Sequence, residues 1–140
     1  MVENTEQWWV ISPQNTDNGS GEFVADLLTS IRSVIDISHI VIGEVEGAIV
    51  YQINPDRKYY YHNLDEILPL IRQAVQFDWC DIFCFNSKND IPEGDLSTID
   101  YPTIISASIV SIRVIDSGTW VEIFTQSEQL YQFLIDRYQP

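Results

Sequence analysis

The side chains of this sequence most able to do chemistry are its histidines and cysteines, and there are two of each. His62 is followed by Asp65 and Glu66, so a histidine with neighbouring carboxylates is available as a general base. His62 also follows three consecutive tyrosines, a setting in which a histidine more often packs at the boundary between two elements. A small ligand-binding or hydrolytic domain, with a site near His62 and residues 87–102, is therefore kept as the alternative to a binding function.

Cys80 and Cys84 lie four residues apart in the apolar run 79–85. In an extended strand this spacing separates their Cα atoms by about 13 Å. A disulfide needs Cα atoms within about 7 Å of each other. The spacing also lacks the C-x₂-C pattern and the second ligand pair of zinc sites. We expect two buried free thiols, no metal site, and a reducing, cytoplasmic environment.

Known catalytic motifs are missing from the sequence. It contains no GxSxG, GxGxxG, HExxH or P-loop pattern. The carboxylates of the loop predicted over Ser87–Pro102 do not follow the spacing of an EF-hand. We assign no catalytic residue, no metal ligand and no cofactor, and this favours a protein that is not an enzyme.

Charge is the extreme feature of the composition. Twenty-one acidic residues against seven basic ones give a formal net charge of −14. Such a charge argues against direct nucleic-acid binding, which needs a basic surface, and it attracts basic proteins. Solubility alone explains an acidic chain equally well. The first nine residues carry Glu3 and Glu6 where a signal peptide is basic, and no apolar run reaches the ~20 residues that span a bilayer, so no membrane association is expected.

Hydrophobic spacing predicts helices in a single acidic globular domain, residues 1–140. Apolar residues recur at helical spacing over 23–35, after a start at Ser20 or Gly21. A second apolar face follows Thr125, which forms a capping box with Glu128.

A further helix is predicted between these two. Asn63 can cap it, with Glu66 three residues on. Pro69 would clash inside an established helix, so the helix either starts near Leu68 or is kinked in its first turn. We expect it to end near Phe77.

The strand pattern predicts an α+β fold, with a mostly antiparallel sheet of about six strands and three helices. The run 79–85 is apolar on both faces except at Asp81, which indicates a central strand covered on both sides. Glu46-Gly47 is predicted as a tight turn and Pro13–Gly21 as a loop. The expected strands are 7–12, 39–45, 48–53, 58–61, 79–85, 103–115 and 119–125.

The last two strands form a hairpin whose register can be argued. With Ser117-Gly118 as a two-residue turn, Arg113 lies directly across from Glu122, so the two make a cross-strand ion pair and no charge is buried. One face of the hairpin is then uniformly apolar, with Val110, Ile112, Val114, Val121 and Ile123. The other face carries Ser111, Arg113, Ile115, Trp120, Glu122 and Phe124.

Exposed aromatic residues ringed by charge are typical of protein interfaces. The hairpin face with Trp120 and Phe124 is the candidate surface if it is open to solvent; if a helix covers it, the acidic loop takes its place. We expect a non-enzymatic protein-binding domain, of an inhibitor or immunity type, that neutralises a basic protein partner. The resemblance to that group is one of composition alone. The predicted partner-binding residues are Trp120, Glu122, Phe124 and Arg113 on the hairpin face, and Asp90, Glu93 and Asp95 in the acidic loop.

Overall fold

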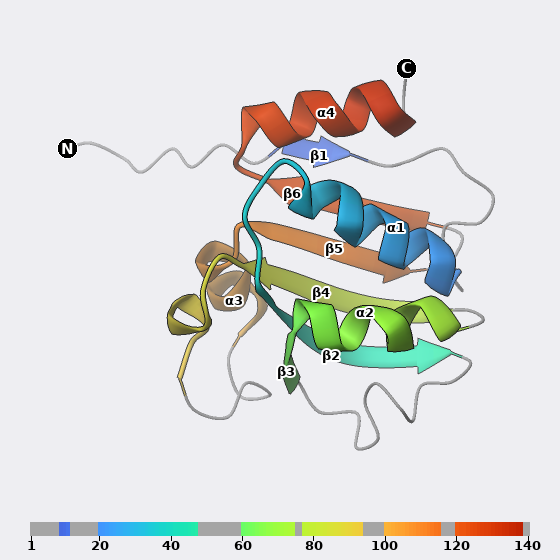
Figure 1. Cartoon of the computed structure of the whole chain (residues 1–140). Coiled ribbons are helices and arrows are strands. Elements are labelled where there is room, and N and C mark those ends of the chain that lie inside the picture. Colours follow the sequence, from blue (N-terminus) through green and yellow to red (C-terminus); the bar gives the residue numbers. More distant parts are fainter. Residues whose placement is uncertain are drawn as a thin grey trace.

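The computed structural model describes residues 9–11, 20–47, 60–74, 77–93, 100–115 and 120–138. These residues form one antiparallel sheet with helices on both faces, so the predicted α+β class is confirmed (Figure 1). The described part contains four α-helices, one more than predicted. In chain order the elements are β1 (Trp9–Ile11), α1 (Gly21–Arg32), β2 (His39–Gly47), β3 (Tyr60–Asn63), α2 (Leu64–Gln73), β4 (Phe77–Phe85), the 3₁₀ turn η2 (Lys88–Asp90), α3 (Tyr101–Ala107), β5 (Val110–Ile115), β6 (Trp120–Thr125) and α4 (Glu128–Tyr138).

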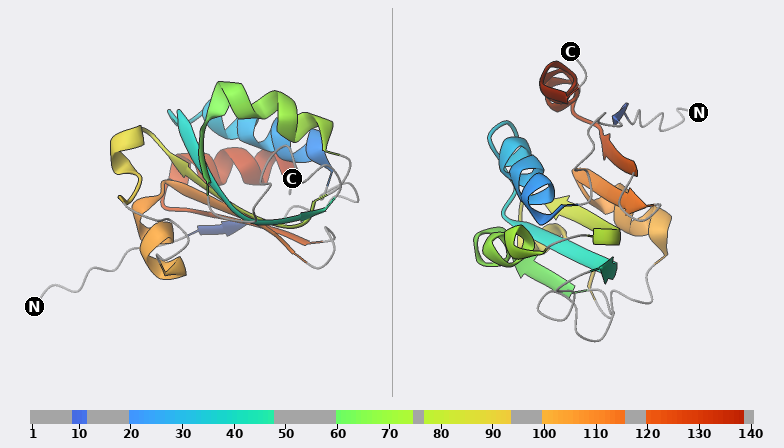
Figure 2. Two further views of the ribbon diagram at one scale, coloured as in Figure 1. Left: turned by 90° about the horizontal axis from the view of Figure 1, so that it is seen from below. Right: turned by 90° about the vertical axis from the view of Figure 1, so that its right-hand side faces the viewer.

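The sheet has six strands in the order β1-β6-β5-β4-β2-β3. Every neighbouring pair is antiparallel. The helices α1, α2 and α4 lie on one face, which we call the helical face (Figure 2). The short helix α3 lies on the other, which we call the back face. β4 is an interior strand of the sheet, as its apolar sequence predicts.

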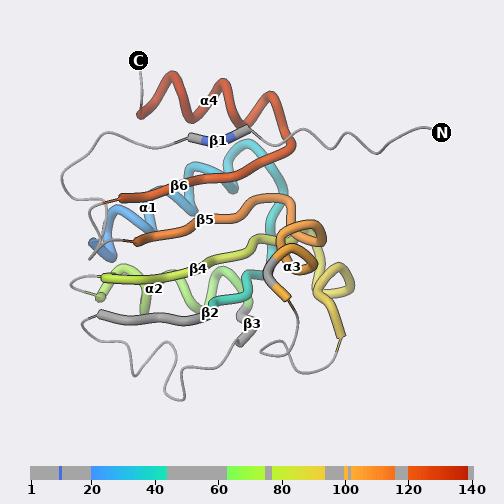
Figure 3. Tube along the Cα trace, turned by 180° about the vertical axis from the view of Figure 1, so that it is seen from behind, coloured from blue at the N-terminus to red at the C-terminus, as the bar shows by residue number. Residues whose placement is uncertain are grey.

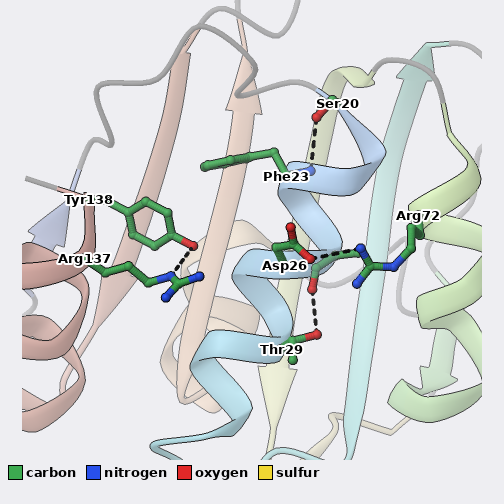
Figure 4. Close-up of polar contacts among 8 residues, drawn as sticks. Ser20, Phe23, Asp26, Thr29, Arg72, Arg137 and Tyr138 are labelled. Carbon is green, nitrogen blue, oxygen red and sulfur yellow. Dashed lines mark hydrogen bonds and ion pairs between the residues drawn. The ribbon is translucent and has the colours of Figure 1, made fainter.

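Two ion pairs join α1 to α2, which run antiparallel to each other. Arg72 Nη1 donates to Asp26 Oδ1 at 2.9 Å (Figure 4). Arg32 pairs with Asp65 at the opposite end of the two helices. These side chains are partly or largely exposed, so each pair contributes little to stability.

Gly21 allows the start of α1 to lie close against the end of α2. Its N–H donates to Ala74 O at 3.0 Å. A Cβ atom built on Gly21 would lie well inside van der Waals contact of the carbonyl oxygens of Ile71 and Ala74. Only glycine therefore fits at the first residue of α1 without moving the end of α2.

The caps of the first two helices are those predicted. Ser20 Oγ accepts from Phe23 N at 3.0 Å, and Asn63 Oδ1 accepts from Glu66 N at 3.3 Å. However, α2 starts at Leu64 rather than Leu68 and holds Pro69 in its interior. It also ends at Gln73, short of the predicted Phe77, because the backbone of Ala74 turns extended there.

The helix α3 was missed by the strand pattern, which predicted one strand over 103–115. Asp100 Oδ1 accepts from Thr103 N at 2.9 Å and caps the helix, and Pro102 stands in its first turn, where a missing N–H costs nothing. The strand β5 begins only at Val110. Local capping thus outweighs the β-branched residues of this stretch.

Two further predictions of boundaries are wrong. Leu130 N donates to Ser127 Oγ at 3.1 Å, so Ser127 caps α4. Thr125 is instead buried at the end of β6. The strand β2 continues through Gly47 with shifts in register, so Glu46-Gly47 is part of a strand rather than a turn. The predicted strand 48–53 lies outside the described residues, as do residues 58–59 of the predicted strand 58–61. The described strand β3 starts at Tyr60, extends to Asn63 and pairs with β2.

The hydrophobic core has two parts. The larger lies between the helical face of the sheet and the helices above it, where buried residues of α1, α2 and α4 meet those of the strands. The smaller lies on the back face, where Ile104 of α3 packs with Val41, Phe83 and Phe85. α3 covers only the end of the sheet at which β4 finishes and β5 begins (Figure 3).

Candidate functional site

The register predicted for the last hairpin is the one observed. Arg113 lies across from Glu122, and Ile115 lies across from Trp120. The predicted ion pair between Arg113 and Glu122 is wrong, because Arg113 pairs with the buried carboxylate of Asp81 on the neighbouring strand. The five apolar residues of the other side are all buried against the helices: Val110, Ile112, Val114, Val121 and Ile123. The alternation of side chains along a strand therefore places the polar and aromatic side of the hairpin on the back face.

Residues of four adjacent strands form a surface on the back face, which we call the open face. None of the described helices lies over it, since α3 is at the other end of β4 and β5 (Figure 3). The cross-strand pairs align its residues in rows, and one row consists of Asp81, Arg113 and Glu122. The members of the open face are Trp79 and Asp81 of β4, Arg113 and Ile115 of β5, Trp120, Glu122 and Phe124 of β6, and Val10 of β1.

Trp120 and Val10 are the exposed large hydrophobic residues of the described chain, at 44% and 48% of their full accessible surface. Phe124 is the cross-strand partner of Val10 and is half-buried, as is Glu122 between the two aromatic residues of β6. An exposed tryptophan on a sheet face is costly in water unless something covers it. Tryptophan, phenylalanine and arginine, all present on this surface, are among the residues enriched at protein interfaces.

An ion pair lies at the base of the open face. Arg113 Nε donates to Asp81 Oδ1 at 3.1 Å, and the side chain of Asp81 is only 3% exposed, against 29% for Arg113. The guanidinium carbon of Arg113 lies 5.8 Å from the ring centroid of Trp79. Arg113 therefore contacts both the carboxylate of Asp81 and the ring of Trp79 on β4.

Asp81 and Trp79 were not among the predicted site residues. The signal that points to Asp81 is a lone charge in an otherwise apolar strand, because a buried carboxylate needs a cation or donors nearby. The prediction that β4 is covered on both sides holds at Phe83 and Phe85, under α3. At Trp79 the strand is only half-buried.

Trp79 also carries an unmatched donor. Its Nε1 is buried and has no hydrogen-bond partner within the described structure. Buried indole N–H groups usually find an acceptor. The open face thus has an unused hydrogen-bond donor beside the Asp81–Arg113 pair.

The acidic loop is only partly described. Asp90, the last residue of the η2 turn, and Glu93 are exposed, while Asp95 lies outside the described residues. Asp100 is also exposed, and the hydrogen bonds from Thr103 lower the pKa of its carboxyl. Asp100 therefore serves as a helix cap, and the structure does not bring Asp90 and Glu93 onto one face with Trp120.

The residues considered for catalysis are described only in part. Only the backbone of His62 is described, paired with Ile40, and Asp65 is held by Arg32. The other histidine, His39, has Nδ1 2.8 Å from the hydroxyl of Ser38.

The hydroxyl of Ser38 donates its proton to a backbone carbonyl. Ser38 Oγ donates to Asn86 O at 2.7 Å. Since a carbonyl can only accept, Ser38 gives its proton to Asn86, and His39 Nδ1 is the donor to Ser38. This arrangement does not prepare Ser38 as a nucleophile. Within the described ranges no three His, Cys, Asp or Glu side chains gather as a metal site.

Cys80 and Cys84 are both buried and free, as predicted. Burial raises the pKa of the Cys84 thiol to about 12. Burial, and secondarily the carboxylate of Asp81, raises the pKa of the Cys80 thiol further. Neither thiol is activated as a nucleophile, because reactivity needs a lowered pKa and access.

Comparison with protein-family models, with curated proteins and with solved structures finds no match to this chain. In the described part of the chain, no helix has both the length and the apolar character needed to cross a bilayer. The function is therefore inferred from the open face and from the charge of the chain.

Proposed function

We propose that this chain is a non-enzymatic protein-binding domain, of an inhibitor or immunity type, that holds a basic protein through its open face. The observation that carries the proposal is Trp120, which is 44% exposed on a sheet face and has Glu122 next to it on the same face. Tryptophan and arginine are the residues most enriched among those that dominate binding energy at protein interfaces.

The layout of the open face supports this proposal. Trp120, Phe124 and Val10 supply apolar area, while Arg113 and Glu122 supply polar groups within the same surface. The strands β4, β5 and β6 beneath it pack on their other side against the larger core, so we expect the face to change little on binding. A rigid face loses little side-chain and backbone freedom when a partner docks.

The charge of the chain supports a basic partner. Three of the described cations, Arg32, Arg72 and Arg113, are already paired with carboxylates of the chain. A basic partner would be attracted over long range by the acids that remain at the surface and would associate faster at low salt. Exposed acids of the described residues include Glu22, Asp36, Glu66, Asp78, Asp90, Glu93, Glu128 and Asp136.

The test is affinity capture from a native lysate at low and moderate salt, with the wild-type chain and two variants. Trp120→Ala removes the exposed anchor of the open face. The double variant Asp90→Asn, Glu93→Gln removes two charges from the acidic loop and leaves the open face intact. A captured protein is then purified, and its association rate with each chain is measured as a function of salt.

We expect the wild-type chain to retain a basic protein. The affinity of the Trp120→Ala variant for that protein should be about tenfold or more lower. Its association rate should fall steeply with salt. Recovery of no partner in either condition contradicts the proposal. So does a partner that Trp120→Ala binds as tightly as the wild type, and loss only in the double variant would move the binding surface to the acidic loop.

A further inference from the structure

The same pair of side chains occurs twice on the open face. Trp79 and Asp81 of β4, and Trp120 and Glu122 of β6, each place an indole and a carboxylate two residues apart on one side of a strand. Residues with this spacing lie about 7 Å apart along the strand. β5 runs between the two strands and carries Arg113 in the row that joins the two carboxylates.

The first of these pairs already holds an arginine. The guanidinium of Arg113 lies 5.8 Å from the ring centroid of Trp79, and its Nε is 3.1 Å from Asp81 Oδ1. A guanidinium suits such a pair because it is planar, stacks on an aromatic ring and presents several N–H donors to a carboxylate. The chain itself thus shows which cation fits a tryptophan and a carboxylate in this arrangement.

The second pair has the same parts in a more accessible place. Trp120 is 44% exposed and Glu122 is half-buried. No ion pair within the described residues involves Glu122. The charge of Arg113 is balanced by Asp81, so it does not repel a second cation at Glu122 as an unpaired arginine would.

We propose that Trp120 and Glu122 form a recognition site for an arginine side chain of the basic partner. The proposal rests on the proposed function and deepens it, since it names the group that the open face recognises. The incoming guanidinium stacks on the indole of Trp120 and donates to the carboxylate of Glu122. Arginine is favoured over lysine because an ammonium group is compact, strongly hydrated and unable to stack as a plane.

The test uses three octapeptides in which glycine alternates with arginine, with lysine or with citrulline. Citrulline keeps the shape of arginine and lacks its charge. Binding is followed by the shift of the Trp120 indole N–H resonance in ¹H–¹⁵N spectra and by tryptophan fluorescence. We expect the affinity for the arginine peptide to be about threefold higher than that for the lysine peptide. It should be about fivefold or more higher than that for the citrulline peptide.

Matched variants separate this site from general attraction to an acidic protein. Glu122→Gln should weaken binding of the arginine peptide about fivefold. Glu128→Gln, at an exposed position on α4, should change that affinity by less than about twofold. Trp120→Leu keeps apolar area and removes the ring, and should weaken binding about threefold. Trp120→Phe keeps an aromatic ring, so its affinity for the arginine peptide should lie between those of Trp120→Leu and the wild type.

Equal effects of Glu122→Gln and Glu128→Gln overturn the proposal, because they show attraction by net charge alone. Equal binding of the arginine and lysine peptides overturns the preference for a guanidinium. Either result leaves the proposed function standing if a captured basic protein still depends on Trp120. If the peptide results hold while no protein partner is captured, the recognition site is supported and the proposed function fails.

Discussion

At the scale of single residues, the Asp81–Arg113 pair joins a buried carboxylate to a half-buried guanidinium. Asp81 is 2% exposed, so its carboxylate depends on donors supplied by the protein. We expect Arg113→Met to lower the free energy of unfolding by about 2–3 kcal/mol, because it removes the cation 3.1 Å from a buried carboxylate. The expected loss in the free energy of unfolding is smaller than for a fully buried ion pair, because the Arg113 side chain is 29% exposed.

The check is a double-mutant cycle with Asp81→Asn, measured by urea denaturation. The double variant should lose less stability than the sum of the two single variants, by about 1 kcal/mol or more. Additive losses would show that the two side chains do not stabilise each other. In that case the contact between them would be incidental to the fold.

The buried thiols give a second prediction at this scale. The folded state raises the pKa of Cys84 to about 12 and also raises that of Cys80, above the ordinary value of 9.0. Their contribution to stability is therefore fully present below pH 9 and is lost as pH rises above it, by up to about 1.4 kcal/mol per pH unit for each thiol.

Two measurements check this prediction. Near neutral pH both thiols should react with a disulfide reagent only as fast as the chain unfolds, and at once in denaturant. A Cys80→Ala, Cys84→Ala chain should lose stability less steeply above pH 9 than the wild type. Rapid labelling of the native chain, or identical alkaline slopes for the two chains, would contradict the assignment of both thiols to the core.

At the scale of elements, the packing of α1 on α2 depends on one missing side chain. Gly21→Ala places a Cβ against the backbone oxygens of Ile71 and Ala74, which have no side-chain freedom with which to move aside. We expect a loss of about 1–3 kcal/mol in the free energy of unfolding, even though alanine favours helices more than glycine does. Glu22→Ala, one residue further along the same helix and exposed, should change stability by less than about 0.5 kcal/mol. Comparable effects of the two substitutions in urea denaturation would show that the close approach is not limiting.

At the scale of the whole molecule, the net charge of −14 should make stability depend on salt. Raising sodium chloride from about 20 mM to about 500 mM shortens the Debye length from more than 20 Å to less than 5 Å and screens the repulsion between surface acids. We expect the melting temperature to rise by several degrees. Sodium chloride is used because sulfate also strengthens hydrophobic burial. A melting temperature that falls with salt would show that ion pairs such as Asp26–Arg72 outweigh the repulsion.

The sequence by itself determined what local patterns control. The apolar face of α1, the caps at Ser20 and Asn63 and the register of the β5–β6 hairpin all depend on residues within a few positions of each other. The register in particular follows from one turn and from the cost of burying a charge. The α+β class and the candidate role of Trp120 and Glu122 follow from these elements.

Local patterns were misleading where two signals compete. The stretch that forms α3 is rich in β-branched residues, and the cap at Asp100 and the burial of Ile104 decide for a helix. At α4, both Thr125 and Ser127 have a hydroxyl at a suitable spacing. The end of β6 buries Thr125 and leaves Ser127 to cap the helix.

Only the tertiary structure decided whether Trp120 is exposed. Sheet faces are covered by elements distant in sequence, and no local pattern says which end of the back face α3 protects. The same holds for the partner of Asp81, since Arg113 is 32 residues away and reaches it only because β4 and β5 are neighbours. Single residues of the open face can therefore be predicted from the sequence. Their assembly into one surface depends on the order of the strands.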